Sequence, residues 1–79
     1  MVTITLYSKP DCHLCAEALE TLRALQAELG FELEEQDITL DDVLQRDYFE
    51  RIPVVAFDGE ELFDYFVDEA VLRERLESR

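Results

Sequence analysis

The chain has 79 residues, which is room for a single domain over residues 1–79, and 48% of them are hydrophobic, enough for an ordinary globular core. It carries 20 Asp and Glu against 7 Lys and Arg, a formal net charge of −13 at pH 7. Such a surface repels phosphate backbones and anionic lipids, so we exclude nucleic acids and membranes as partners. We expect the acidity to serve solubility, the alternative being that it favours a basic partner surface.

The sequence carries no recognisable targeting or membrane segment. Its apolar runs are far shorter than the ~18 residues that span a bilayer. Residues 1–7 lack the basic start and apolar stretch of a secretory signal. These features predict a cytoplasmic protein, which we expect to be a monomer.

The first two elements are predicted with the clearest patterns. Residues 2–7 are apolar and β-branched and predict a central strand, which Pro10 ends because proline has no N–H to donate. Residues 12–29 carry apolar side chains at steps of three and four, which is typical of an amphipathic helix packed on a sheet. We expect Asp11 to cap the start of this helix and Gly30 to end it.

The middle of the chain predicts a strand followed by a short helix. Residues 31–38 partly alternate, and their charges suit the edge of a sheet. Thr39 or Asp41 can cap a helix over residues 42 to about 49. The aromatic pair at its end, Tyr48 and Phe49, is expected in the core, with an exposed docking patch beside the cysteines as the alternative.

The last third predicts a hairpin and a final helix. Residues 54–57 form a buried strand, residues 58–59 a tight turn and residues 60–65 the returning strand, while Asp68 caps the last helix. The resulting order is β-α-β-α-β-β-α. A right-handed crossover and a hairpin then build a four-stranded mixed sheet with helices on both faces, an α/β arrangement of the thioredoxin fold.

Cys12 and Cys15, the only cysteines, stand in C-x-x-C spacing. A disulfide across so small a loop removes little entropy from the unfolded chain, so it is a poor structural staple and favours redox chemistry instead. A structural zinc site needs four ligands, which two cysteines and the single histidine, His13, do not supply. We therefore expect no metal.

The position of Cys12 predicts its chemistry. A cysteine at the first turn of a helix faces unpaired N–H groups and the positive end of the helix dipole, which lower the pKa of its thiol. Lys9 would add to this effect, whereas Asp11 opposes it. A protonated His13 would hold the thiolate and touch the substrate; the alternative is that Lys9 and His13 are ordinary solvated side chains. Cys15 lies one turn further along, toward the interior. We predict that Cys12 attacks a substrate disulfide and that Cys15 resolves the mixed disulfide.

Residues 7–15, Tyr-Ser-Lys-Pro-Asp-Cys-His-Leu-Cys, resemble the Y-S-K-P-G-C-P-Y-C stretch of glutaredoxins and are more similar still to short bacterial glutaredoxin-like proteins that carry C-H-L-C. Arg51-Ile52-Pro53 resembles the T-V-P segment of that family. The resemblance implies a thiol–disulfide oxidoreductase with a cis Ile52–Pro53 bond beside Cys12. It also implies that the Ile52 backbone binds an extended peptide or glutathione. An ordinary turn proline is the alternative.

The resemblance is weakest where glutaredoxins hold glutathione. That family usually has Gly-Gly followed by Asp or Ser after the last strand, and the matching residues 63–68 are largely bulky and aromatic. Glutathione is also anionic, like this surface. We expect no tightly bound cofactor and no efficient use of glutathione. A disulfide-containing protein or small molecule is the expected substrate, with glutathione or a flavoprotein reductase as candidate electron donors.

Two other functions stay open. The first is an iron–sulfur or metal carrier that uses Cys12, against which the poor glutathione match argues. The second is a non-catalytic thioredoxin-fold binding domain that docks a partner through Ile52 and Pro53. An intact C-x-x-C pair argues against this second function, because such a domain needs neither thiol.

Overall fold

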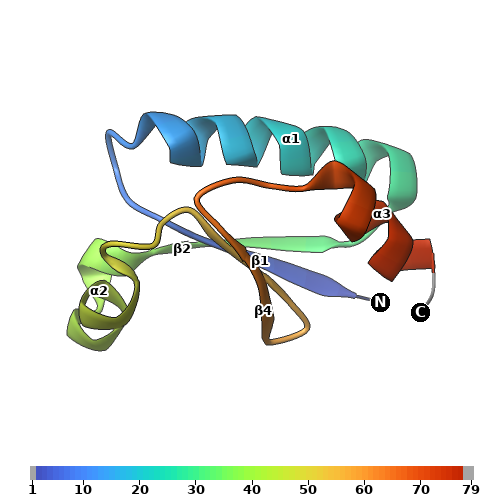
Figure 1. Cartoon of the computed structure of the whole chain (residues 1–79). Coiled ribbons are helices and arrows are strands. Elements are labelled where there is room, and N and C mark those ends of the chain that lie inside the picture. Colours follow the sequence, from blue (N-terminus) through green and yellow to red (C-terminus); the bar gives the residue numbers. More distant parts are fainter. Residues whose placement is uncertain (1, 78–79) are drawn as a thin grey trace.

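The computed structural model describes residues 2–77 (Figure 1). The elements are β1 (Thr3–Ser8), α1 (His13–Leu29), β2 (Glu32–Asp37), the 3-10 turn η1 (Ile38–Leu40), α2 (Asp42–Tyr48), β3 (Val54–Phe57), β4 (Glu60–Asp64) and α3 (Glu69–Glu77). Apart from the added 3-10 turn, this is the predicted order. Within residues 2–77, no helix is both long and apolar enough to cross a bilayer.

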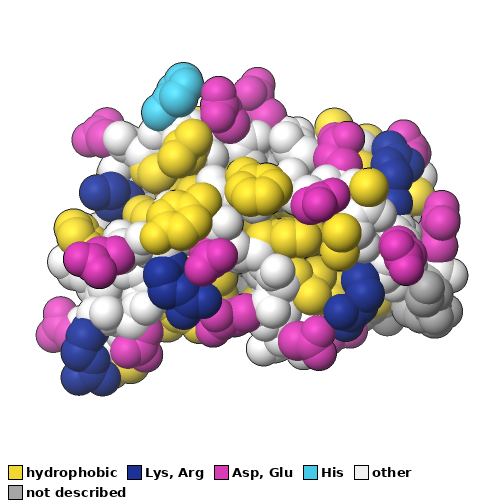
Figure 2. Space-filling model, viewed as in Figure 1, with side chains coloured by type: hydrophobic (Ala, Val, Ile, Leu, Met, Phe, Trp, Pro, Cys, Tyr) yellow, Lys and Arg dark blue, Asp and Glu magenta, His cyan; other side chains and the backbone are white. Residues whose placement is uncertain are grey.

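The four strands form one mixed sheet in the order β2-β1-β3-β4. β1 pairs in parallel with β2 and antiparallel with β3, and β3 pairs antiparallel with β4. Figure 1 shows α1 and α3 over one face of the sheet and α2 beyond the other face, at one end. On the face seen in Figure 2, carboxylates surround a central group of hydrophobic side chains. The predicted mixed sheet with helices on both faces is confirmed.

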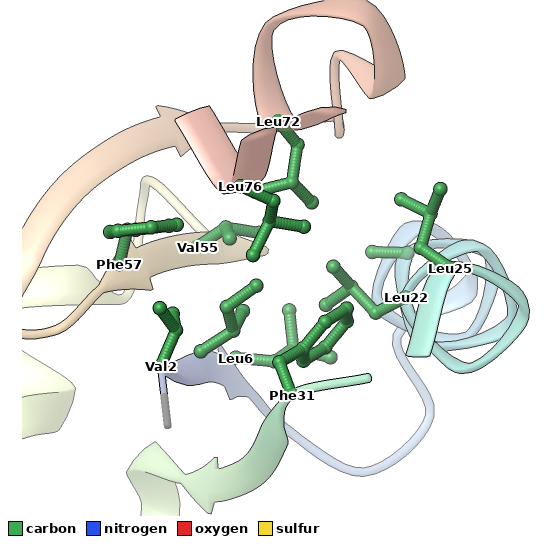
Figure 3. Packing of buried hydrophobic residues seen from close by; sticks show 11 residues of the cluster. Val2, Leu6, Leu22, Leu25, Phe31, Val55, Phe57, Leu72 and Leu76 are labelled. Carbon is green, nitrogen blue, oxygen red and sulfur yellow. The ribbon is translucent and has the colours of Figure 1, made fainter. Parts of the chain in front are cut away.

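The main core lies between the sheet and the pair α1 and α3 (Figure 3). Alternation along β1 turns Ile4 and Leu6 toward these helices, and both are fully buried. β3 is buried along its whole length, as expected for a central strand. The remaining members come from several elements and include Leu22, Leu25, Phe31, Val55, Phe57, Leu72 and Leu76. This core packs the middle of α1, at Ala18, Leu22 and Leu25, against β1.

Local capping explains where the helices begin and end. Gly30 ends α1 with a φ of 71°, as predicted. Asp41 starts α2 by accepting hydrogen bonds from the N–H groups of Val43 (2.8 Å) and Leu44 (3.3 Å). Asp68 accepts one from the N–H of Val71 (3.2 Å) at the start of α3. Both Asp caps satisfy N–H groups that a helix start otherwise leaves unpaired.

The expectation that Tyr48 and Phe49 both belong to the core is wrong for Phe49, which is 51% exposed. Phe49 is the C-cap residue of α2 and keeps a helical backbone, so its side chain lies about 100° around the helix axis from that of Tyr48. Tyr48 is partly buried and stacks on Tyr7 with ring centroids 4.5 Å apart. The Lys9 ammonium nitrogen instead lies over the exposed Phe49 ring, 5.1 Å from the ring centroid.

Candidate active site

Cys12 and Cys15 form a disulfide at the start of α1. Their Cα atoms lie 5.2 Å apart, within the ordinary range for a disulfide. Cys12 is partly exposed, whereas Cys15 is only 4% exposed. One sulfur is therefore open to a reaction partner, and the other is shielded behind it, as predicted from their spacing along the helix.

Cys12, and not Asp11, is the N-cap residue of α1, so the predicted Asp11 cap is wrong. The Cys12 Sγ accepts a hydrogen bond from the Cys15 N–H at 3.3 Å. Asp11 has a φ of 61°, a left-handed conformation that aspartate tolerates better than most residues. It therefore turns the loop one residue before the N-cap, Cys12. The carboxylate does not compete with the sulfur for this N–H donor.

Lys9 and His13, the only lysine and the only histidine, lie on either side of Cys12. Both line a shallow pocket of about 480 Å³ together with Cys12 and Cys15. The Lys9 ammonium is held over the Phe49 ring. His13 is strongly exposed, and its Nε2 lies 3.3 Å from a carboxylate oxygen of Glu17. His13 is thus paired with a carboxylate one helical turn further along α1.

The Ile52–Pro53 peptide bond is cis, as the resemblance implied. Ile52 belongs to a small apolar cluster with Cys15 and Ile38, against which Cys12 packs, so this segment lies beside the disulfide. The Ile52 N–H already donates to the Tyr48 carbonyl at 3.1 Å. A bound peptide strand would therefore pair with the Ile52 carbonyl or displace this internal contact.

A polar network that sequence reasoning missed supports the proline segment. The Arg51 guanidinium donates to the Glu61 carboxylate, and its Nε lies 3.3 Å from Asp64 Oδ2. It also lies over the Tyr48 ring at 5.3 Å. The hydrogen bond from Arg51 lowers the pKa of Glu61 and raises that of Arg51 itself. Both carboxylates come from β4, so the network ties the residue before Ile52 to the edge of the sheet.

A β-bulge makes this network possible. Residues three apart on a regular strand, such as Glu61 and Asp64, point to opposite faces. The register of β3 against β4 shifts between Val55 and Ala56, so that Glu61 pairs with Ala56 and Asp64 with Val54. Both carboxylates thus lie on one face. No pattern in the sequence indicates this bulge.

Tyr65 and Phe66 lie in the region where glutaredoxins usually carry Gly-Gly, so this chain differs there from the glutaredoxin pattern. Tyr65 has a φ of 74°, a conformation that costs a non-glycine residue about 1–2 kcal/mol. Hydrogen bonds offset this cost: its N–H donates to the Pro53 carbonyl (2.8 Å), and its hydroxyl donates to the Glu50 carbonyl (2.8 Å). The loop after β4 is thereby attached to the proline segment.

Among the residues that the structure describes, no group of three or more His, Cys, Asp or Glu side chains is placed to hold a metal ion. Other predicted site residues gather around the disulfide: Lys9 and His13 line one pocket with it, and Ile52 packs beside it.

A four-stranded mixed sheet with a C-x-x-C disulfide at the start of α1 and a cis-proline segment beside it defines a thioredoxin-fold protein with a candidate redox site. A thioredoxin variant from Halobacterium salinarum shares the fold, with a TM-score of 0.70 at 21% identity over 98% of this chain and 73% of that chain. The protein belongs to the family described as Glutaredoxin-like domain (DUF836), which matches residues 3–77.

Two relatives share a higher sequence identity with this chain, and their names state no activity. The uncharacterised protein Rv0508 of Mycobacterium tuberculosis is 33% identical over 75 residues, covering 89% of this chain and 77% of its own. The solution structure of protein Ne2328 from Nitrosomonas europaea has a TM-score of 0.82 at 36% identity, over 94% of this chain and 89% of that chain. These similarities establish the family and the fold.

Proposed function

We propose that this protein is a dithiol–disulfide oxidoreductase that uses Cys12 as nucleophile and Cys15 as resolving thiol. The observation that carries the proposal is the Cys12–Cys15 disulfide at a helix N-terminus, with one sulfur partly exposed and the other buried. Family membership supports it, because the matched domain is glutaredoxin-like. A purely structural disulfide across this short loop would contribute little stability.

The reaction starts from the reduced protein. The Cys12 thiolate attacks one sulfur of a substrate disulfide, forms a mixed disulfide and expels the first substrate thiolate. The Cys15 thiol loses its proton and attacks the Cys12 sulfur, which forms the internal disulfide and expels the second substrate thiolate. Two electrons pass to the substrate, and the two thiolates take up protons. A thiol or dithiol donor, such as glutathione or a reductase, then returns the protein to the dithiol state.

Local electrostatics favour the first step. After reduction, the Cys15 N–H and the start of α1 face the Cys12 sulfur and stabilise its anion more than its thiol. Lys9 supplies a positive charge in the same pocket. Asp11 is the nearest opposing charge along the chain, and it forms no cap bond to the helix.

The proposal is tested by equilibrating the protein in buffers of reduced and oxidised dithiothreitol, alkylating free thiols and measuring mass. The chain has only two cysteines, so the two-electron couple changes the alkyl count by two in one step. A reversible transition between zero and two alkyl groups is the expected result. Two alkyl groups under oxidising conditions, or disulfides only between chains, would refute the proposed couple. A Cys15→Ser variant, which has no internal partner for Cys12, serves as the control.

A further inference from the structure

An apolar hollow of about 180 Å³ lies between the start of α1 and residues 65–67, which connect β4 to α3. Its apolar lining comes from Leu14, Ala18, Tyr65, Phe66 and Val67. Three of these side chains are large and well exposed: Leu14 at 49%, Tyr65 at 52% and Phe66 at 66%. Neighbouring exposed side chains of this size on a small acidic protein indicate a contact surface.

Neither cysteine lines the hollow, but Leu14 connects it to the redox pair and Tyr65 connects it to the proline segment. Leu14 is one of the two residues between Cys12 and Cys15, so the backbone holds it close to the disulfide. Tyr65 donates its N–H to the Pro53 carbonyl at 2.8 Å, which fixes the opposite wall. A substrate chain that continued from Cys12 past Leu14 would reach this apolar surface.

Charges around the hollow are predominantly negative. Glu17 lines it, and Asp64 and Asp68 lie at the two ends of its loop. Arg51, whose carbonyl accepts a hydrogen bond from the Tyr65 N–H at 3.3 Å, has its guanidinium shared between two carboxylates, Glu61 and Asp64. Figure 2 shows carboxylates, together with some cationic side chains, around the hydrophobic side chains of the face that it draws. With a net charge of −13, the field over this surface attracts cations and repels anions.

We infer that this hollow binds an apolar side chain of a protein substrate that carries Lys or Arg beside its disulfide. The inference rests on the proposed function and specifies its substrate class. The redox step is the same two-electron exchange, in which the protein dithiol becomes a disulfide and the substrate disulfide becomes two thiols. Apolar contact provides the anchor, and charge complementarity selects cationic over anionic substrates.

The experiment mixes the reduced protein, freed of dithiothreitol, with blocked peptides that carry one cysteine as a mixed disulfide with 2-mercaptoethanol. The first peptide has Leu next to the cysteine and Arg on both flanks. The second replaces both Arg with Glu, and the third replaces Leu with Ala. Neutral 2-hydroxyethyl disulfide is the reference substrate. Formation of the Cys12–Cys15 disulfide is followed by alkylation and mass, and each rate constant is divided by the reference rate of the same variant.

We expect the Arg–Leu peptide to react about tenfold or more faster than the Glu–Leu peptide at low ionic strength. The difference should shrink at about 1 M salt, where the screening length is only about 3 Å. Replacing Leu with Ala should slow the reaction several-fold. Phe66→Ser should remove most of this Leu effect. Leu40→Ser removes an apolar side chain that is 84% exposed in η1, outside the hollow, and should change neither ratio.

Two outcomes overturn the inference. Equal normalised rates for the Arg and Glu peptides would refute the charge selection, and a Leu effect unchanged by Phe66→Ser would refute the hollow as the anchor. Failure of the reduced wild-type protein to react with 2-hydroxyethyl disulfide would instead refute the proposed function itself. The reference substrate thus separates the two failures.

Discussion

The Cys12 sulfur accepts a hydrogen bond from the backbone N–H of Cys15, the residue with which it also shares a disulfide. We expect the same N–H donor to face the Cys12 sulfur when the disulfide opens, where it favours the thiolate over the thiol. We therefore expect the pKa of the Cys12 thiol to lie below the ordinary value of about 8.5. Ultraviolet absorbance of the thiolate in a Cys15→Ser variant measures this pKa for Cys12 alone. A value at or above the ordinary one would show that the helix start does not stabilise the anion.

Tyr48 is expected to titrate above the ordinary range of a tyrosine side chain. Burial, and after it the hydrogen bond donated to Glu61, raises the pKa of Tyr48 to about 12. A raised folded-state pKa means that the neutral phenol stabilises the fold. This contribution is complete below the unfolded-state pKa of about 10 and is lost as the pH rises from about 10 to about 12.

A spectrophotometric titration of the three tyrosines checks this expectation. One of the three absorbance steps should occur near pH 12 and disappear in Tyr48→Phe. Tyr65→Phe is the matched control and should retain the late step. If all three tyrosines titrated together in the folded protein, the arrangement around Tyr48 and Glu61 would be contradicted.

The sequence predicts those features of the fold and the site that depend on residues close together in the chain. Local signals sufficed for the Asp58–Gly59 turn, whose residues have φ values of 48° and 90°, and for the Gly30 cap. The spacing of apolar residues placed α1 against the sheet. The ion pairs of Arg51 could not be predicted, because they depend on a register shift between β3 and β4. The sequence of either strand alone does not indicate that shift. Asp11 was misassigned because an N-cap preference is weak beside the geometry of the loop that precedes the helix.

Substitutions in the hydrophobic core should have the largest effects on the free energy of unfolding. Leu22 is fully buried between α1 and the sheet, so Leu22→Ala should lower the free energy of unfolding by about 2–5 kcal/mol, most of what a domain this small has. Urea denaturation measures the change. Leu40→Ala is the control at an exposed position and should stay within about 0.5 kcal/mol of wild type. Similar losses for both variants would contradict the packing described.

The start of α3 provides a second, smaller test of stability. Asp68 accepts the Val71 N–H, so Asp68→Ala should cost about 1 kcal/mol. Asp68→Asn retains an oxygen that can accept this bond and should cost much less. Thermal unfolding followed by circular dichroism compares the two. Equal losses in both variants would indicate that charge, and not the capping bond, is what stabilises this helix.

The division of labour between the two cysteines is tested most directly by trapping. Cys12→Ser, Cys15→Ser and wild-type protein are each reduced, freed of reductant and mixed with 2-hydroxyethyl disulfide, and their masses are measured over time. We predict that Cys15→Ser accumulates a mixed disulfide at Cys12, that wild type passes to the internal disulfide with release of two thiols, and that Cys12→Ser reacts far more slowly because Cys15 is buried. Equal adduct formation on the two single-cysteine variants would contradict the assignment of Cys12 as the attacking residue.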